Sequence, residues 1–180
     1  MKNFLDKYFG RFGNRLFQTA FLYAYSKEHG IDYYFQDPKW FEKYEKDIQH
    51  LFGEGVGFDP RVSIQVRRGD YVGNPFYVDL MATDYYWEAM KLFVSRKFLV
   101  FSDDIEWCKK QEIFKDCDFS EGLDDIDSFN AQASCNGHII ANSSWGWWCA
   151  YLGPGKVIAP KAWYSDGITR TVCPKDWIRI

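Results

Sequence analysis

The stretch VSIQVRRGDY, residues 62–71, decides the fold class. Its first five residues, Val62–Val66, form a short, β-branched, mostly apolar run typical of a buried strand. Similar short runs follow at residues 98–101, 116–119, 138–141 and 156–159. Helical patterns lie between them at about 84–95, 104–112, 125–134 and 145–152. This alternation predicts an α/β fold: a Rossmann-like parallel sheet with helices on both faces.

The chain before this stretch has a different pattern. Apolar residues with a helical period follow Gly13 and Asn14, and Gly30 ends that helix. A short strand is expected at Ile31–Phe35 and an amphipathic helix at Trp40–Phe52. The Gly-rich segment that ends at Pro60 is the best boundary in the chain. We therefore predict a small N-terminal α/β part, residues 1–60, and a Rossmann-like domain, residues 61–180.

Composition excludes several classes of protein. The 180 residues carry a formal charge of -3, which argues against a nucleic-acid-binding surface. The cysteines are odd in number, and no Cys/His group has the spacing of metal ligands, so we expect reduced thiols and no metal site. No apolar run is long enough for a signal peptide or a transmembrane segment. The expectation is a cytoplasmic protein without a membrane span.

Polar clusters follow three of the expected strands, and the first is the most informative. Arg67 and Arg68 end the strand, and Asp70 comes two residues later. Guanidinium groups match phosphate oxygens in a two-pronged geometry, and Asp70 would hold one arginine or bind a sugar hydroxyl. The alternative is an ordinary surface ion pair between arginine and aspartate. Because ligands bind at the carboxyl ends of parallel strands, we favour a binding site.

The other clusters suit the same site. Ser102, Asp103 and Asp104 offer carboxylates for ribose hydroxyls or for the N–H edge of guanine; alternatively, one aspartate only caps the next helix. A pair of carboxylates also suggests a metal, but no third ligand is near in the sequence.

Small polar residues stand where further helices begin. Asn142, Ser143 and Ser144 lie at a strand-to-helix junction suited to a diphosphate, with helix capping as the alternative. Gly13 and Asn14 stand before a helix, where an anion site and a plain capped turn both remain open.

Taken in order, these motifs resemble the α-1,2-fucosyltransferase family, family eleven of the glycosyltransferases. The resemblance rests on five segments: Arg11–Gln18, Gln65–Tyr71, Phe101–Cys108, Asn142–Trp148 and Val157–Trp163. Two features depart from the family pattern. Gln65 stands where the family has a histidine, and the segment between Gln18 and Arg67 is much shorter than in most members.

The resemblance implies a GT-B-type fold, here with a reduced first domain on the acceptor side and the donor domain at residues 61–180. It implies inverting transfer of L-fucose from GDP-fucose to a hydroxyl of a glycan acceptor, typically the 2-OH of galactose. Arg67 would bind the pyrophosphate, supported by Arg68, with Asp70 beside them as the remaining catalytic candidate. The other residues expected at the donor are Gly13, Asn14, Gln65, Ser102, Asp103, Asp104, Asn142, Ser143 and Ser144.

No metal and no resident cofactor is implied. Two alternatives stay open: a transferase that uses another GDP-sugar, and an inactive protein that binds a GDP-sugar or a glycan. Gln65 and the short first part motivate the second alternative. A homo-oligomer that completes the acceptor side is a further open possibility.

Overall fold

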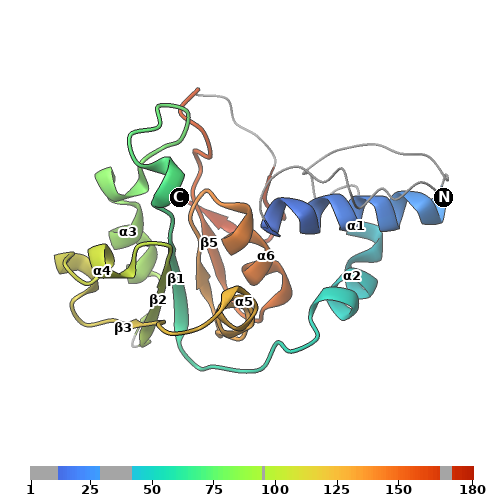
Figure 1. Cartoon of the computed structure of the whole chain (residues 1–180), viewed down its shortest axis with the longest axis horizontal. Coiled ribbons are helices and arrows are strands. Elements are labelled where there is room, and N and C mark those ends of the chain that lie inside the picture. Colours follow the sequence, from blue (N-terminus) through green and yellow to red (C-terminus); the bar gives the residue numbers. More distant parts are fainter. Residues whose placement is uncertain (1–11, 29–41, 95, 167–171) are drawn as a thin grey trace.

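The computed structural model describes residues 12–28, 42–94, 96–166 and 172–180 of the chain. Within these residues a six-stranded, wholly parallel sheet runs through the molecule in the order β3-β2-β1-β4-β5-β6 (Figure 1). The strands are β1 (Val62–Val66), β2 (Phe98–Ser102), β3 (Asp118–Phe119), β4 (His138–Ile139), β5 (Val157–Ala159) and β6 (Ile178–Arg179). This is the predicted α/β, Rossmann-like architecture.

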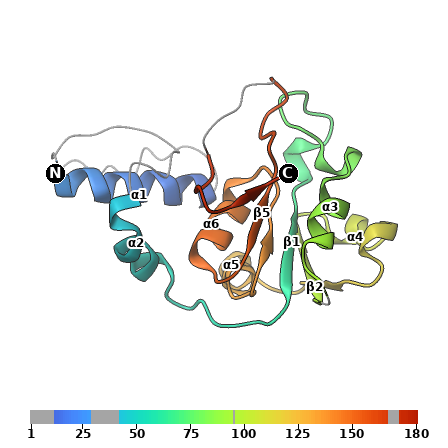
Figure 2. The same cartoon turned by 180° about the vertical axis from the view of Figure 1, so that it is seen from behind.

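Helices cover both faces of the sheet, as predicted (Figures 1 and 2). The α-helices are α1 (Phe12–Glu28), α2 (Glu45–Phe52), α3 (Tyr85–Lys91), α4 (Ile105–Cys108), α5 (Asp125–Ala133) and α6 (Ser144–Leu152). Short 3-10 helices lie at Glu42–Tyr44, Gly69–Tyr71, Leu80–Ala82 and Glu112–Phe114. The core is divided accordingly: α3 packs with β1 and β2 on one face, and α5 and α6 form the centre of the other.

The strand order explains where a ligand can bind. From β1 the chain moves outward through β2 to β3, and it then returns to place β4 on the other side of β1. Ile64 of β1 pairs with Val100 of β2 and with Ile139 of β4. The connections that leave β1 and β4 therefore turn in opposite directions, and the crevice between them is where open parallel sheets hold their ligands.

The N-terminal helices pack against α6. The ring centroid of Phe17 in α1 lies 4.3 Å from that of Trp147 and 4.9 Å from that of Trp148. Ile48 of α2 is fully buried in the same cluster, and Phe52 meets Trp148 edge-on. The apolar face expected for residues 14–24 is thus the face that α1 buries.

Some expected elements differ in extent. The helix expected at Trp40–Phe52 is a 3-10 turn followed by α2, and α1 begins before Gly13 rather than after it. β6 was not expected, because a pair of exposed edge residues carries no alternation pattern. The strand expected at Ile31–Phe35 and the residues Trp40 and Phe41 lie outside the described residues, and the division of the chain at residue 60 stays a prediction.

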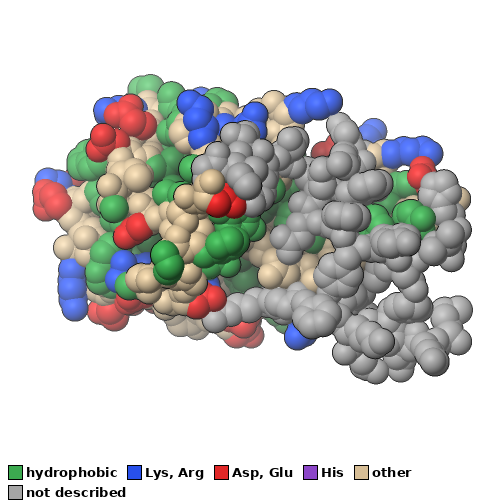
Figure 3. All heavy atoms as spheres, turned by 90° about the horizontal axis from the view of Figure 1, so that it is seen from above, with side chains coloured by type: hydrophobic (Ala, Val, Ile, Leu, Met, Phe, Trp, Pro, Cys, Tyr) green, Lys and Arg blue, Asp and Glu red, His purple; other side chains and the backbone are tan. Residues whose placement is uncertain are grey.

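Basic and acidic side chains are interspersed on the described part of the face seen in Figure 3. None of the described helices is long and apolar enough to cross a membrane.

Candidate functional site

A cavity of about 650 Å³ opens at the carboxyl ends of β1 and β2, bordered by α5 and by the first turns of α1 and α6. It lies beside the point where the connections from β1 and β4 separate. Its volume is in the usual range for pockets that bind small organic ligands. Nine of the predicted site residues line it: Gly13, Asn14, Gln65, Arg67, Asp70, Ser102, Asp103, Ser143 and Ser144.

Arg67 is the cation that β1 delivers to this cavity. Its side chain is 14% exposed and its guanidinium makes ion pairs with Asp70 and with Asp103, the latter at 2.6 Å between Nη1 and Oδ2. The guanidinium also lies over the ring of Tyr71, 5.3 Å from its centroid. A guanidinium has five N–H donors. The two ion pairs use different nitrogens, so the group is held in place and keeps further donors for a ligand.

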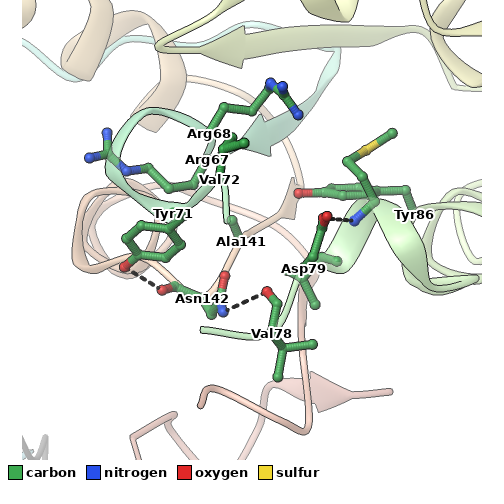
Figure 4. A pocket seen from close by; sticks show the side chains of 11 residues that line it. Arg67, Arg68, Tyr71, Val72, Val78, Asp79, Tyr86, Ala141 and Asn142 are labelled. Carbon is green, nitrogen blue, oxygen red and sulfur yellow. Dashed lines mark hydrogen bonds between the residues drawn. The ribbon is translucent and has the colours of Figure 1, made fainter. Parts of the chain in front are cut away.

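Arg68 points elsewhere, although it is adjacent in the sequence. Figure 4 shows the two arginine side chains diverging from the end of β1. Arg68 stacks on the indole of Trp107, with its Cζ 3.4 Å from the ring centroid, and its Nε donates to Asp104 at 3.1 Å. Arg68 therefore does not line the large cavity, because residues that follow one another at a strand end leave on opposite sides. The two arginines share only a small hollow of about 20 Å³, which Tyr71 and Asn142 also line.

The two aspartates after β2 have different roles. Asp104 is the N-cap of α4: its Oδ1 accepts from the backbone N–H of Trp107 at 3.2 Å. Asp103 lines the cavity, where it holds the guanidinium of Arg67 and accepts from the backbone N–H of Arg68 at 2.8 Å. The sequence left open that one aspartate of the pair only caps the next helix, and Asp104 is that aspartate.

The three residues of the Asn-Ser-Ser junction also have different positions relative to the cavity. Asn142 is 2% exposed, and its amide donates to the carbonyls of Val78 and Trp163 at 3.2 and 2.9 Å. It ties two loops together and does not line the large cavity. Ser143 and Ser144 do line it, and Ser143 makes no side-chain cap bond to α6. The positive end of the α6 dipole therefore faces the cavity.

Gly13 brings the first turn of α1 directly against the start of α6. A Cβ at Gly13 would lie 2.5 Å from the carbonyl carbon of Ser144 and 2.6 Å from the backbone nitrogen of Trp145. Only glycine permits this approach, and it places Asn14 at the cavity beside Ser144. Gly13 and Asn14 both lie within the first turn of α1. The alternative from the sequence, a plain capped turn before the helix, therefore does not describe them.

Gln65 lines the cavity on the same side of β1 as Arg67, as strand alternation predicts. Its side chain is almost fully buried, and its Oε1 accepts from the backbone N–H of Ala141 at 3.2 Å. Gln65 therefore links β1 to the end of β4 while it contributes to the wall of the site.

Sequence reasoning missed several residues of the cavity wall. Asp125, Ser128 and Gln132 lie on one face of α5, and their i, i+3, i+7 spacing was the available signal. Gln132 is fully buried, and its Oε1 accepts from the indole N–H of Trp145 at 3.0 Å. Its amide nitrogen has no hydrogen-bond partner among the described residues.

Two tyrosines complete the wall of the cavity. Tyr71 and Tyr77 both line the cavity. The hydroxyl of Tyr71 donates to the carbonyl of Asn142 at 3.0 Å, and burial raises the pKa of Tyr71 well above its usual value. The hydroxyl therefore keeps its proton and remains a donor at physiological pH. Across the described ranges, no three His, Cys, Asp or Glu side chains gather as metal ligands.

Two curated proteins of Escherichia coli are similar to this chain in sequence. An alpha-1,2-colitosyltransferase of Escherichia coli is 33% identical over 177 residues, which cover 82% of this chain and 61% of that protein. The O-antigen biosynthesis glycosyltransferase WbnK of Escherichia coli is 28% identical over 137 residues, which cover 66% of this chain and 44% of that protein.

The chain thus spans less than two thirds of the length of either relative. No solved structure matches it. The model of one protein family, glycosyl transferase family 11, matches residues 2–180. A match over almost the whole sequence, on a Rossmann-like sheet with an arginine at its switch point, shows that the chain belongs to glycosyl transferase family 11.

Proposed function

We propose that this protein is an inverting glycosyltransferase that moves L-fucose from GDP-fucose to a hydroxyl of a glycan acceptor, the 2-OH of galactose. The bond between the sugar C1 and the diphosphate oxygen breaks, and a bond forms from C1 to the acceptor oxygen. The acceptor hydroxyl loses its proton, and GDP leaves. Family membership supports the reaction class, and the α-1,2 linkage in the name of the colitosyltransferase supports the position of transfer.

The observation that carries the proposal is the position of Arg67. It stands at the carboxyl end of β1, mostly buried, at the wall of the cavity beside the switch point of the sheet. Negative charge builds on the departing diphosphate during transfer. A fixed cation aimed at that charge is the largest single contribution that such a site can make, about 3–4 kcal/mol for one donor in comparable sites.

The surrounding groups suit a diphosphate as well. Ser143 and Ser144 bring hydroxyls and the N-terminus of α6 to the cavity, and Asn14 adds an amide from the first turn of α1. Helix N-termini favour anions through their dipole and their unpaired N–H groups. Asn14 from the N-terminal part and the two serines from the Rossmann-like part thus line one cavity together with Arg67, which follows β1.

One alternative concerns the sugar. A diphosphate contact does not read the hexose, and a relative at 33% identity is named a colitosyltransferase. The same site would then serve a nucleotide-linked colitose. The other alternative is a protein that binds the donor or a glycan without transfer, which Gln65 in place of the family histidine motivates.

A donor screen tests the proposal. Thermal unfolding is measured with GDP-fucose, GDP-mannose, GDP and UDP-galactose. A ligand present at one hundred times its Kd stabilises the native state by about 2.7 kcal/mol. We expect stabilisation by the GDP compounds and none by UDP-galactose.

Transfer is then measured with GDP-fucose and lactose, alongside hydrolysis of the donor. Fucosylated product supports the transferase. Stabilisation by GDP-fucose without product or hydrolysis would instead support the binding protein. A chain that UDP-galactose stabilises, and GDP compounds do not, would refute the assignment of the donor.

A further inference from the structure

A second hollow adjoins the donor cavity. It has a volume of about 260 Å³, and we call it the tyrosine recess, after the Tyr71, Tyr77 and Tyr164 side chains in its wall. Asn14, Tyr71, Tyr77 and Ser144 line both the recess and the donor cavity, so the two spaces are adjacent and share part of one wall. Pockets for larger organic ligands measure about 300–1,000 Å³. The recess therefore suits one sugar ring better than a nucleoside diphosphate.

The rings of the recess are held in fixed positions. Tyr71 and Tyr77 stack with centroids 3.7 Å apart and planes 5° apart, and the ring centroid of Tyr164 lies 5.9 Å from that of Tyr77, with the planes tilted by 33°. An antiparallel backbone bridge joins Tyr77 to Tyr164, and the backbone N–H of Ser165 donates to the carbonyl of Phe76 at 3.0 Å. A prearranged wall loses little conformational entropy when a ligand binds.

The recess also has the chemistry of a carbohydrate site. Aromatic rings present a large apolar surface to the C–H face of a pyranose, and tyrosine carries a polar group at its tip. The hydroxyl of Ser144 and the amide of Asn14 add hydrogen-bonding groups on the side that faces the donor cavity. Trp163, which is largely buried, contributes a further apolar surface.

The position of the recess relative to Arg67 decides which sugar it suits. Tyr71 lies between the guanidinium of Arg67, 5.3 Å from its ring centroid, and the ring of Tyr77 (Figure 4 shows Arg67 beside Tyr71). A diphosphate on Arg67 would hold its sugar near the boundary that the two spaces share. A ring in the recess then lies next to the carbon that is transferred.

We propose that the tyrosine recess is the acceptor subsite and that it binds the terminal hexopyranose of the glycan on Tyr77 and Tyr164. The proposal rests on the proposed function, because it takes the larger cavity as the donor site. It assigns the residues that position the acceptor, and it predicts that they act on the acceptor and leave the nucleotide alone.

The test uses the full chain with Tyr77→Leu and Tyr164→Leu, and with Tyr77→Phe, which keeps the ring. Trp87→Leu on α3 is the matched control, because Trp87 is an exposed aromatic side chain that lines neither space. Binding of methyl β-galactoside is followed by saturation-transfer NMR with and without GDP. Binding of GDP is measured by calorimetry, and the acceptor KM is measured with lactose and GDP-fucose.

We expect both leucine variants to raise the acceptor KM and to weaken galactoside binding about ten-fold, with the Kd for GDP unchanged. Trp87→Leu should behave as wild type in all three measurements, and Tyr77→Phe, which keeps the ring, should raise the acceptor KM less than Tyr77→Leu does. Unchanged acceptor KM and galactoside binding in both leucine variants would overturn the proposal. An equal loss of GDP affinity would also overturn it, because the tyrosines would then stack on the nucleobase.

Failure of the proposed function gives a different result. A wild-type chain that binds methyl β-galactoside through Tyr77 but does not bind GDP would refute the transferase and support the recess as a glycan site. A chain that binds and uses GDP-fucose but gives no galactoside signal in wild type would keep the transferase and overturn the recess.

Discussion

Replacement of Arg67 by alanine is the most direct perturbation of the site. In the structure this guanidinium pairs with Asp70 and Asp103, and it is 14% exposed. Loss of a largely buried, charge-assisted contact to a diphosphate costs about 2–5 kcal/mol of binding free energy. We therefore expect the Kd for GDP to rise between about 30-fold and several thousand-fold.

The same substitution also leaves two carboxylates without their cation. Asp70 is about half exposed and Asp103 less so, and solvent relieves part of that cost. A stability loss of about 1–3 kcal/mol is expected. The loss is expected because two ion pairs hold this strand-end arginine in place, so it does not project freely into solvent.

Arg61 provides a matched control at the opposite end of β1. It too pairs with two carboxylates, Asp59 at 2.6 Å and Asp118 at 3.0 Å, but it lies outside the donor cavity. Arg61→Ala should lower stability and leave the affinity for GDP unchanged. Calorimetry with GDP and urea unfolding measure both properties for each variant. Unchanged GDP affinity in a folded Arg67→Ala protein would refute the reasoning at its centre.

Four further outcomes are expected. Activity should survive EDTA, since the site uses side-chain cations and helix termini; a strict need for Mg²⁺ or Mn²⁺ in transfer assays would contradict this. Gly13→Ala should destabilise the packing of α1 on α6 and raise the donor KM, because its Cβ would lie 2.5 Å from the Ser144 backbone at the wall of the donor cavity. Urea unfolding and kinetics measure the two effects, and wild-type values in both would argue against that contact. Burial lowers the pKa of His138 from 6.5 to about 4, so protonation of this histidine favours the unfolded chain. The free energy of unfolding should therefore fall, as the pH drops from 6.5 toward 4, by roughly 3 kcal/mol more in the wild type than in His138→Gln. Urea unfolding of both proteins across this pH range measures the difference, and parallel pH profiles would disprove the prediction. Gln65→His should raise turnover, because an imidazolium on the cavity side of β1 adds charge for the leaving diphosphate; an unchanged kcat would mean that the residue only positions the donor.

The parallel sheet and the switch-point cavity were accessible from the sequence for a local reason. The run Val62–Val66 and its later counterparts are short, apolar and separated by helical periods, and only a parallel sheet buries such strands on both faces. The polar residues that follow each strand must then gather at one edge. This places Arg67, Asp103 and Ser144 together without knowledge of any contact.

The sequence pattern did not show which of two neighbouring, chemically equal residues lines the cavity. Arg67 and Arg68 are chemically identical in the sequence, but one faces the cavity and the other stacks on Trp107. Asp103 and Asp104 divide in the same way, into an ion-pair partner at the cavity and a helix cap. Each choice depends on which element packs beside the strand end.

Long-range contacts were likewise beyond the sequence. The i, i+3, i+7 stripe of α5 becomes a cavity wall only because α5 packs beside α6, where Trp145 anchors Gln132. The tyrosine recess forms because a backbone bridge brings Tyr77 to Tyr164, residues far apart in the chain. Periodicity acts over a few residues and therefore determines the elements and their order. The tertiary structure alone decides which side chains meet, because burial and pairing depend on surfaces that distant segments supply.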